Sequence, residues 1–420
     1  MRLRRVARIM ASVLYSIKDQ FSHSGKSPYS LLSSSSSNSA AQVGAALCSS
    51  LPINLLDRLS LYRCLFAQHT PSLLCVFLAS LIAAVAASSW IETCLLTVLL
   101  LVLFLFGLVY YIEMFFTFVP NIPRQSRFFV ELPNSSQFPV WQVIRLTAPP
   151  LGSGCDVISK SFLLLQEDVS KRAVAPTILF LHGNAGNIGH RLPLAKVLYD
   201  VCGANIFLLE YRGFGYSNGH PNEYGVYSDA MAALDYLAAG ANGEVDGRNI
   251  FLFGRSLGGA VAIELGTRSA VASIIRGTII ENTFTSIGDI AQTMASNVMG
   301  PLGKYTIPTG LIHNRFESLK KLSTRDISGN AKFLFISGSK DDLVPPQMMT
   351  QLANAWAANT GQVQEESWMF NDPHDFVHHG SEGLVRFPEG NHGTTWTCEG
   401  FNDVIKRFIS LHQLPGNTGM

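Results

Sequence analysis

The sequence predicts an α/β fold in which helices cover both faces of a mostly parallel sheet of about eight strands. Three observations support this prediction: β-rich runs recur along roughly the last 280 residues, helix-period segments separate the later runs, and turn-forming Gly, Asn and Pro residues lie between them. Most of the runs are continuously apolar. Because strands buried on both faces have this pattern, the sheet is expected to be parallel and doubly covered.

The expected elements follow in chain order. The eight strands are predicted at 140–146, 161–165, 176–181, 205–211, 249–253, 278–281, 332–337 and 383–387, and the helices at 192–199, 224–239, 260–268, 345–359 and 401–411. A stretch at about 285–331 is placed to form a short cap over the carboxyl ends of the strands. The whole domain is expected to span residues 120–414.

The N-terminal part has a different composition. Residues 1–70 hold eight Lys or Arg against two acids and a serine run, which favours a disordered basic segment. Residues 71–119 predict one or two transmembrane helices, at about 72–90 and 94–116, because Glu92 is the only charge between Leu73 and Ile112. A membrane location, in the endomembrane system, is therefore expected.

The side of the membrane that the domain occupies depends on the number of spans. Two spans place the domain on the side of the basic N-terminal segment, and one span places it on the opposite side. The short turn between the helices and the Ala and Ser residues of the first helix favour a single span.

Composition excludes several function classes. The formal net charge is +1 and no basic face is evident, so nucleic-acid binding is not expected. The seven cysteines are scattered and are predicted to be free thiols. The histidines at 374, 378 and 379 lie in an insertion, 365–382, that is typical of a solvated loop, and neither a metal nor any other cofactor is predicted.

One motif carries the chemistry. Gly254-Arg255-Ser256-Leu257-Gly258 closes an apolar strand and opens a helix, as in the nucleophile elbow of serine hydrolases. The glycines let strand and helix approach at a sharp turn that strains the serine backbone. Ser256 is therefore the predicted nucleophile, and Arg255 is expected to pair with a nearby carboxylate.

A serine nucleophile needs a base and an orienting acid. His392 follows the last strand and precedes the last helix, so it is the predicted base. Asp341 is the predicted acid, with its neighbour Asp342 as the alternative and Glu281 as a third candidate. The chain order serine, acid, histidine is that of the α/β-hydrolase fold.

Two backbone N–H groups are expected to bind the developing oxyanion. The first belongs to Leu257, directly after the nucleophile. The second comes from the turn after the third strand and is assigned to Asn184, with Ala185 as the alternative. This glycine-rich turn lacks the Gly-Lys-Ser/Thr ending of a phosphate-binding loop.

Together, the segments 182–193, 211–215, 254–259 and 281–284 resemble the α/β-hydrolase domain-containing protein 13 family, over about residues 128–414. The resemblance implies a membrane-anchored serine hydrolase, related to protein depalmitoylases, with Ser256, Asp341 and His392 as its triad. We therefore expect hydrolysis of an acyl ester or thioester in a small molecule, lipid or protein. The alternatives are a serine peptidase of the prolyl-oligopeptidase type and a non-catalytic membrane-tethered interaction module.

Overall fold

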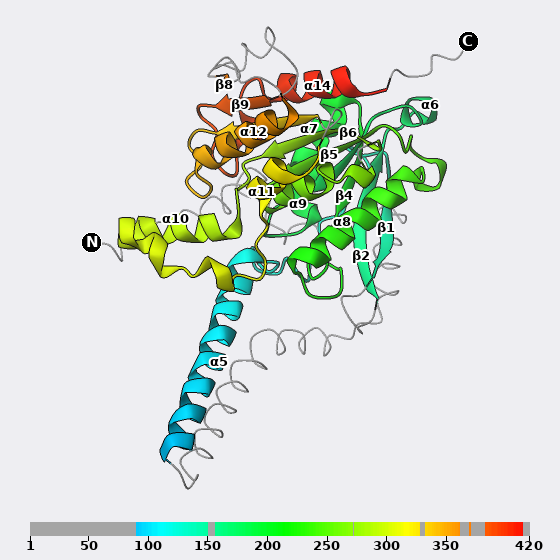
Figure 1. Ribbon diagram of the computed structural model, residues 1–420. Coiled ribbons are helices and arrows are strands. Elements are labelled where there is room, and N and C mark those ends of the chain that lie inside the picture. Colours follow the sequence, from blue (N-terminus) through cyan, green and yellow to red (C-terminus); the bar gives the residue numbers. More distant parts are fainter. Residues whose placement is uncertain are drawn as a thin grey trace. The chain divides into compact units, whose positions relative to one another are not determined.

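The computed structural model describes residues 90–149, 156–271, 273–327, 332–361, 369–370 and 383–414 (Figure 1). Among these, the residues from Glu113 onward form one compact unit, and Trp90 to Ile112 belong to a second. The expected basic segment and nearly all of the first expected membrane helix lie outside the described residues. The same holds for the histidines at 374, 378 and 379.

Helix α5 (Trp90–Thr117) corresponds to the second expected apolar helix and begins at Trp90, four residues earlier than expected. In the part of the chain that the structure describes, no helix combines the length and the apolarity that crossing a membrane requires. The predicted transmembrane spans are therefore not confirmed.

The sheet contains all eight expected strands. Its order among the described residues is β1-β2-β4-β3-β5-β6-β7-β9-β8, and the ninth strand, β8, is a two-residue element inside the 365–382 insertion. The pairs β1/β2 and β2/β4 are antiparallel and all others are parallel. The strands are β1 (Val140–Ala148), β2 (Val157–Leu165), β3 (Thr177–Leu181), β4 (Asn205–Leu209), β5 (Ile250–Arg255), β6 (Ile275–Glu281), β7 (Phe333–Gly338), β8 (Met369–Phe370) and β9 (Gly383–Phe387).

Helices cover both faces of this sheet, as predicted. Two hydrophobic clusters lie on its opposite faces, one packed by α8, α9 and α12 and the other by α7 and α14. The expected helices are α7 (Leu192–Cys202), α8 (Glu223–Ala238), α9 (Leu257–Gly266), α12 (Pro346–Thr360) and α14 (Phe401–His412), and a short α6 (Val169–Arg172) was not anticipated.

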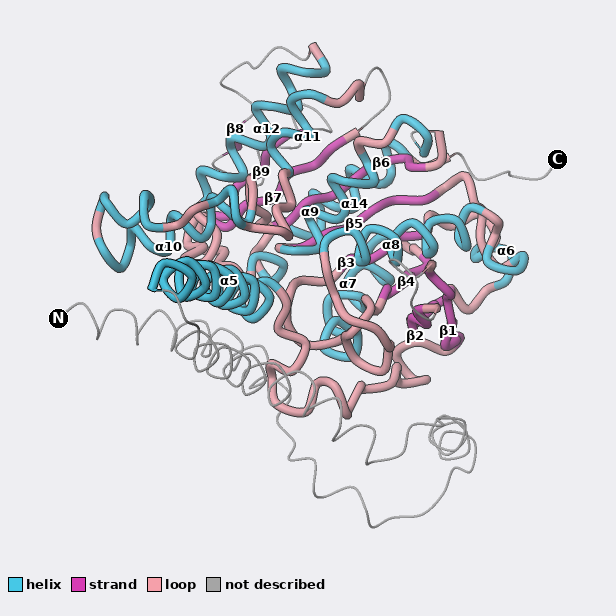
Figure 2. Tube along the Cα trace, turned by 60° about the horizontal axis from the view of Figure 1, so that its bottom comes forward, coloured by secondary structure: helices cyan, strands magenta, loops and turns pink. Residues whose placement is uncertain are grey.

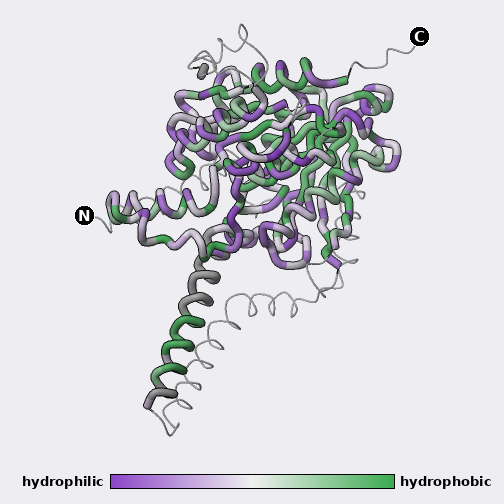
Figure 3. The backbone as a smooth tube through the Cα atoms, viewed as in Figure 1, coloured by the Kyte–Doolittle hydropathy of each residue, from purple (hydrophilic) through white to green (hydrophobic). Residues whose placement is uncertain are grey.

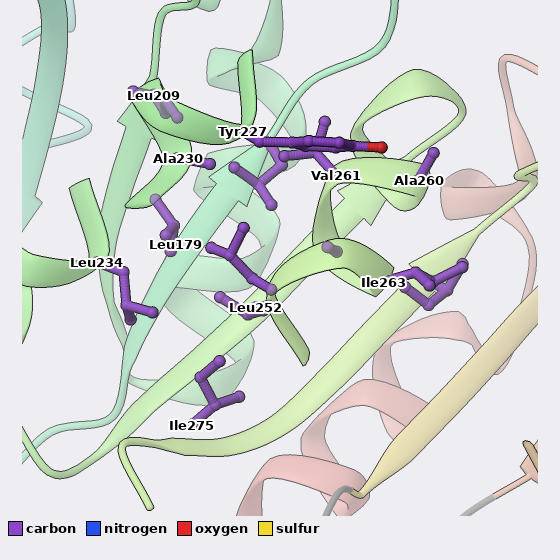
Figure 4. Packing of buried hydrophobic residues seen from close by; sticks show 14 of the residues in the cluster. Leu179, Leu209, Tyr227, Ala230, Leu234, Leu252, Ala260, Val261, Ile263 and Ile275 are labelled. Atoms are coloured by element: carbon purple, nitrogen blue, oxygen red, sulfur yellow. The ribbon is translucent and has the colours of Figure 1, made fainter. Parts of the chain in front are cut away.

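The core sits between the central strands and these helices. Every residue of β3, β4 and β5 is buried, which explains why these runs are apolar on both faces (Figure 3). On one face, Leu179 of β3 and Leu252 of β5 pack against Ala230 of α8 and Val261 of α9 (Figure 4). This packing fixes the helix that follows Ser256 against the middle of the sheet.

The predicted cap region connects β6 to β7. It contains α10 (Ile287–Met299), the 3₁₀ helices η5 (Pro301–Thr306) and η6 (Thr309–Leu311), and α11 (Ser318–Thr324) (Figure 2). Ser286 begins α10 as its N-cap, with its side chain accepting a hydrogen bond from the Asp289 N–H at 3.0 Å. Gly300 and Pro301 end α10 and start η5.

The chain reverses its direction of winding across the sheet at β3. From β3 it moves to β4 on one side, and it then returns to build β5 on the other side of β3. In open α/β sheets, the crevice outside the carboxyl ends of the strands at such a reversal is the usual place for a ligand. Ser256 follows β5 directly and the turn 182–187 follows β3, so both occupy this position.

Candidate active site

Ser256 lies in the sharp turn between β5 and α9. Its backbone has φ 54° and ψ −119°, a left-handed and strained conformation for a residue with a side chain. Only 8% of its surface is exposed. A strained, nearly buried serine at a strand-to-helix turn is the geometry predicted for the nucleophile elbow.

Glycine is required at two positions of this turn. A Cβ atom on Gly258 would lie 1.9 Å from the carbonyl oxygen of Leu181 in β3, and one on Gly254 would lie 2.3 Å from the carbonyl oxygen of Gly258. Both distances are far shorter than any real Cβ contact. The two glycines therefore allow α9 to start directly against β3 and β5.

His392 and Asp341 meet Ser256 at the same edge of the sheet. His392, in the loop after β9, has its Nε2 atom 3.1 Å from the Ser256 Oγ and its Nδ1 atom 2.8 Å from the Asp341 Oδ2. The Asp341 side chain is 1% exposed, and that of His392 is 15% exposed. The structure thus brings together three side chains that are up to 136 residues apart in the sequence.

The other two candidate acids occupy different positions. Asp341 is held because its Oδ1 atom accepts hydrogen bonds from the N–H groups of Leu343, at 3.0 Å, and Val344, at 2.8 Å. Asp342 is exposed. Glu281 is fully buried at the end of β6, and its carboxylate makes no hydrogen bond to His392.

Of the two expected oxyanion donors, Leu257 follows Ser256 in the chain. Asn184 belongs to the turn after β3, which lies against Ser256. Leu257 is the first residue of α9, and an N–H at this position has no acceptor within its own helix. Gly183, next to Asn184, is so close that a Cβ on it would lie 3.5 Å from the Ser256 Cβ. The Asn184 carbonyl accepts a hydrogen bond from the Val119 N–H at 2.9 Å, which helps to fix the turn. The donor roles of both residues stay predictions.

Arg255 pairs with a carboxylate, as expected, and also holds the histidine loop. Its Nε atom lies 3.9 Å from the Glu281 Oε2, and its Nη2 donates to the His392 carbonyl at 2.6 Å. Burial raises the pKa of Glu281 above its ordinary value of 4.5, and the Arg255 guanidinium opposes this shift. The ion pair with Arg255 is the main compensation for burying the Glu281 carboxylate.

Two residues that the sequence analysis did not single out also hold the site. The Asn282 side chain donates to the Asn391 carbonyl at 3.1 Å and to the Thr395 Oγ1 at 2.9 Å, and it accepts from the Gly338 N–H at 2.8 Å. The Thr283 hydroxyl donates to the Ser256 carbonyl at 2.5 Å. The sequence could have indicated both residues, because they are polar and directly follow a buried central strand.

The described residues contain no group of three or more His, Cys, Asp or Glu side chains placed to hold a metal ion. Three of the seven cysteines, Cys94, Cys202 and Cys398, are described, and all three are free thiols. Burial raises the pKa of Cys202 to about 12, which keeps this thiol protonated and unreactive at neutral pH.

The parallel sheet, the elbow and the convergence of side chains at the strand ends define the class of protein: it is an α/β hydrolase. Residues 172–314 match the family model described as serine aminopeptidase, S33. The chain is 32% identical to the protein bem46 of Schizosaccharomyces pombe over 60% of its own length and 73% of the relative. The protein therefore belongs to the α/β-hydrolase family that includes bem46.

Other relatives share this part of the chain. The α/β hydrolase domain-containing protein WAV2 of Arabidopsis thaliana is 36% identical over 54% of this chain and 66% of the relative. An uncharacterized membrane protein of Saccharomyces cerevisiae is 29% identical over 58% of this chain and 73% of the relative. Among solved structures, the carboxylesterase EstE1 from a metagenomic library is 16% identical, with a TM-score of 0.48 over 69% of this chain and 95% of its own.

Proposed function

We propose that the protein is a serine hydrolase that cleaves acyl esters or thioesters through a Ser256–His392–Asp341 triad. The observation that carries this proposal is the pair of distances at His392, 3.1 Å to the Ser256 Oγ and 2.8 Å to the Asp341 Oδ2. These are the contacts that a general base needs with its nucleophile and with its orienting acid.

The reaction follows from these contacts. His392 takes the Ser256 hydroxyl proton through Nε2 as the oxygen attacks the acyl carbonyl carbon, and Asp341 stabilises the imidazolium through Nδ1. The N–H groups of Leu257 and Asn184 bind the oxyanion, each contributing about 3–4 kcal/mol in comparable sites. Attack of Ser256 gives a tetrahedral intermediate that carries this oxyanion. Its collapse to the acyl-enzyme expels the alcohol or thiol, which takes the proton from His392. Water, activated by the same histidine, then hydrolyses the acyl-enzyme.

The substrate class is assigned from the surroundings of the site. The apolar run from Leu95 to Tyr111 precedes the hydrolase domain, and one relative is named a membrane protein. We therefore propose that the protein associates with a membrane and acts on fatty acyl chains held there, in a lipid or an acylated protein. Fractionation of cell lysates at neutral pH by ultracentrifugation tests this part, because recovery of the protein in the soluble fraction would contradict it.

A serine peptidase is the second candidate, and the description of the matching family model as a serine aminopeptidase favours it. The same triad cleaves amides when the leaving amine is protonated by the histidine. The relative rates on esters, thioesters and amides therefore have to distinguish the ester or thioester hydrolase from the peptidase.

The decisive experiment compares wild type with Ser256→Ala. Purified protein is treated with a fluorophosphonate probe and then assayed on acyl thioesters, short esters and dipeptide amides. We expect labelling of wild type alone and hydrolysis of esters and thioesters. Activity restricted to amides would favour the peptidase, and a wild type that the probe does not label would favour a non-catalytic interaction module.

A further inference from the structure

The tip of the cap exposes three large apolar side chains. Met299, the last residue of α10, is 52% exposed, and Leu302 and Tyr305, both in η5, are each 75% exposed. Single exposed apolar residues are ordinary on protein surfaces, whereas several on one short segment mark a contact with another apolar surface. We call these three residues together with Lys304 the cap tip.

The segment η5, which carries most of the cap tip, packs tightly against α10. Gly303 is buried, and a Cβ on it would lie 2.2 Å from the Ala295 carbonyl oxygen, so η5 packs directly against α10. Both views show α10 standing away from the sheet and its covering helices (Figures 1 and 2). The side chains of Leu302 and Tyr305 are therefore held outward by the backbone packing.

The charges of the cap segment that contains the tip have one sign. Between Asp289 and Glu317 the sequence contains no acid, and its formal charges are Lys304 and Arg315. The Lys304 Nζ lies 4.8 Å from the centre of the Tyr305 ring. Apolar side chains beside a tyrosine and a lysine are the composition of the membrane–water interface, where the lysine reaches anionic headgroups.

The other end of the cap is fixed to the end of α5. The Glu113 carboxylate accepts hydrogen bonds from the His313 N–H at 2.9 Å and from the Asn314 N–H and Nδ2, both at 2.6 Å. Glu113 is nearly buried, and it comes two residues after the apolar run that ends at Tyr111. The base of the cap is therefore hydrogen-bonded to the C-terminal end of α5, and both partners belong to the compact unit that begins at Glu113.

We propose that the cap tip docks on the interfacial layer of an anionic phospholipid bilayer. Met299, Leu302 and Tyr305 enter the boundary between headgroups and acyl chains, and Lys304 contacts the anionic headgroups. Docking delivers membrane-held acyl substrates to Ser256; this last part rests on the proposed function, whereas the docking itself does not.

The first test uses the full-length protein and its rates on two substrates. One is an acyl ester embedded in vesicles that contain phosphatidylserine, and the other is a soluble short-chain ester. Replacing both side chains, in a Leu302→Asp, Tyr305→Asp variant, is expected to lower the vesicle rate about tenfold or more and to leave the soluble rate unchanged. Val169→Asp is the matched control, because Val169 is 69% exposed on α6, outside the cap.

Headgroup charge tests the role of Lys304. Lys304→Glu is expected to reduce the preference for anionic over zwitterionic vesicles about fivefold or more. A single lysine near an anionic surface strengthens binding by about 1 kcal/mol, which corresponds to about fivefold in the binding constant. An unchanged vesicle rate in the double variant, with the soluble rate retained, would overturn the docking proposal. A wild type inactive on both substrates would instead contradict the proposed function, and the next measurement would then decide the docking.

The second test does not depend on activity. Leu302→Cys and, as control, Leu411→Cys are treated with a water-soluble maleimide, and the labelled peptide is identified by mass spectrometry. Leu411 is 54% exposed on α14. We expect anionic vesicles to slow labelling at position 302 about fivefold or more but not at 411. Equal labelling at both positions, or protection at 302 that appears with protein concentration and without vesicles, would refute membrane docking.

Discussion

The side chain of Arg255 is hydrogen-bonded to the backbone of His392: its Nη2 atom donates to the His392 carbonyl oxygen at 2.6 Å. The residue just before the serine of the elbow therefore fixes the loop that carries the histidine, 137 positions later in the chain. Buried Glu281 beside it holds the guanidinium in place. The distance between Nε2 and the Ser256 Oγ thus depends on a charged side chain that touches neither atom.

Arg255→Lys is expected to lower kcat about 10- to 100-fold with little change in KM, because the shorter reach of the lysine loses a charge-assisted hydrogen bond and frees the histidine loop. Retaining the positive charge keeps Glu281 compensated. Steady-state kinetics on a soluble ester measure the effect. Arg248→Lys, at an arginine whose side chain is 80% exposed, is the control and should behave like wild type.

The adjacent pair Asp341 and Asp342 allows a matched comparison. Asp341→Asn is expected to reduce kcat by about three to four orders of magnitude, because the amide no longer stabilises the imidazolium or selects its tautomer. Asp342→Asn changes an exposed carboxylate and should leave kcat within about twofold. Equal losses in the two variants would contradict the assignment of the acid.

Gly258→Ala tests the packing of the elbow. The added Cβ would lie 1.9 Å from the Leu181 carbonyl oxygen, so α9 must shift, and the free energy of unfolding is expected to fall by about 3 kcal/mol or more. Thermal unfolding of the purified variant gives the comparison. In Gly310→Ala the new Cβ meets nothing within 4 Å, and its melting temperature should match that of wild type.

The partly buried His190 side chain is expected to lower the free energy of unfolding in acid. Burial, helped by the neighbouring Arg191, lowers its pKa from 6.5 to about 3. The unfolded chain then binds a proton below pH 6.5 that the folded protein does not bind until about pH 3, so stability present above pH 6.5 is lost as pH falls through this range. The contribution is roughly 1 kcal/mol for each pH unit.

Urea denaturation at about pH 8 and about pH 5 checks this prediction. His190→Gln removes the titrating ring and should lose less stability between the two conditions than wild type does. Identical losses would show that other groups cause the acid sensitivity. The comparison at the higher pH is the internal control, because the ring is neutral there in both the folded and the unfolded states.

The sequence by itself determined the sheet, its covering helices and the turn at Ser256. Short continuous apolar runs between turn residues favour strands that are covered on both faces, and the glycines at 254 and 258 admit a sharp turn that other residues would block. These are local patterns, with periods of a few residues. The positions of the eight expected strands and five expected helices therefore agree with the structure.

The tertiary structure decided which polar groups meet. Asp341 rather than Asp342 faces His392 because the N–H groups of Leu343 and Val344 orient its carboxylate. The contacts of Arg255 and Asn282 with the loop at 391–395 join segments more than 100 residues apart. No local pattern encodes such contacts, since they arise only when the carboxyl ends of separate strands are brought to one edge of the sheet.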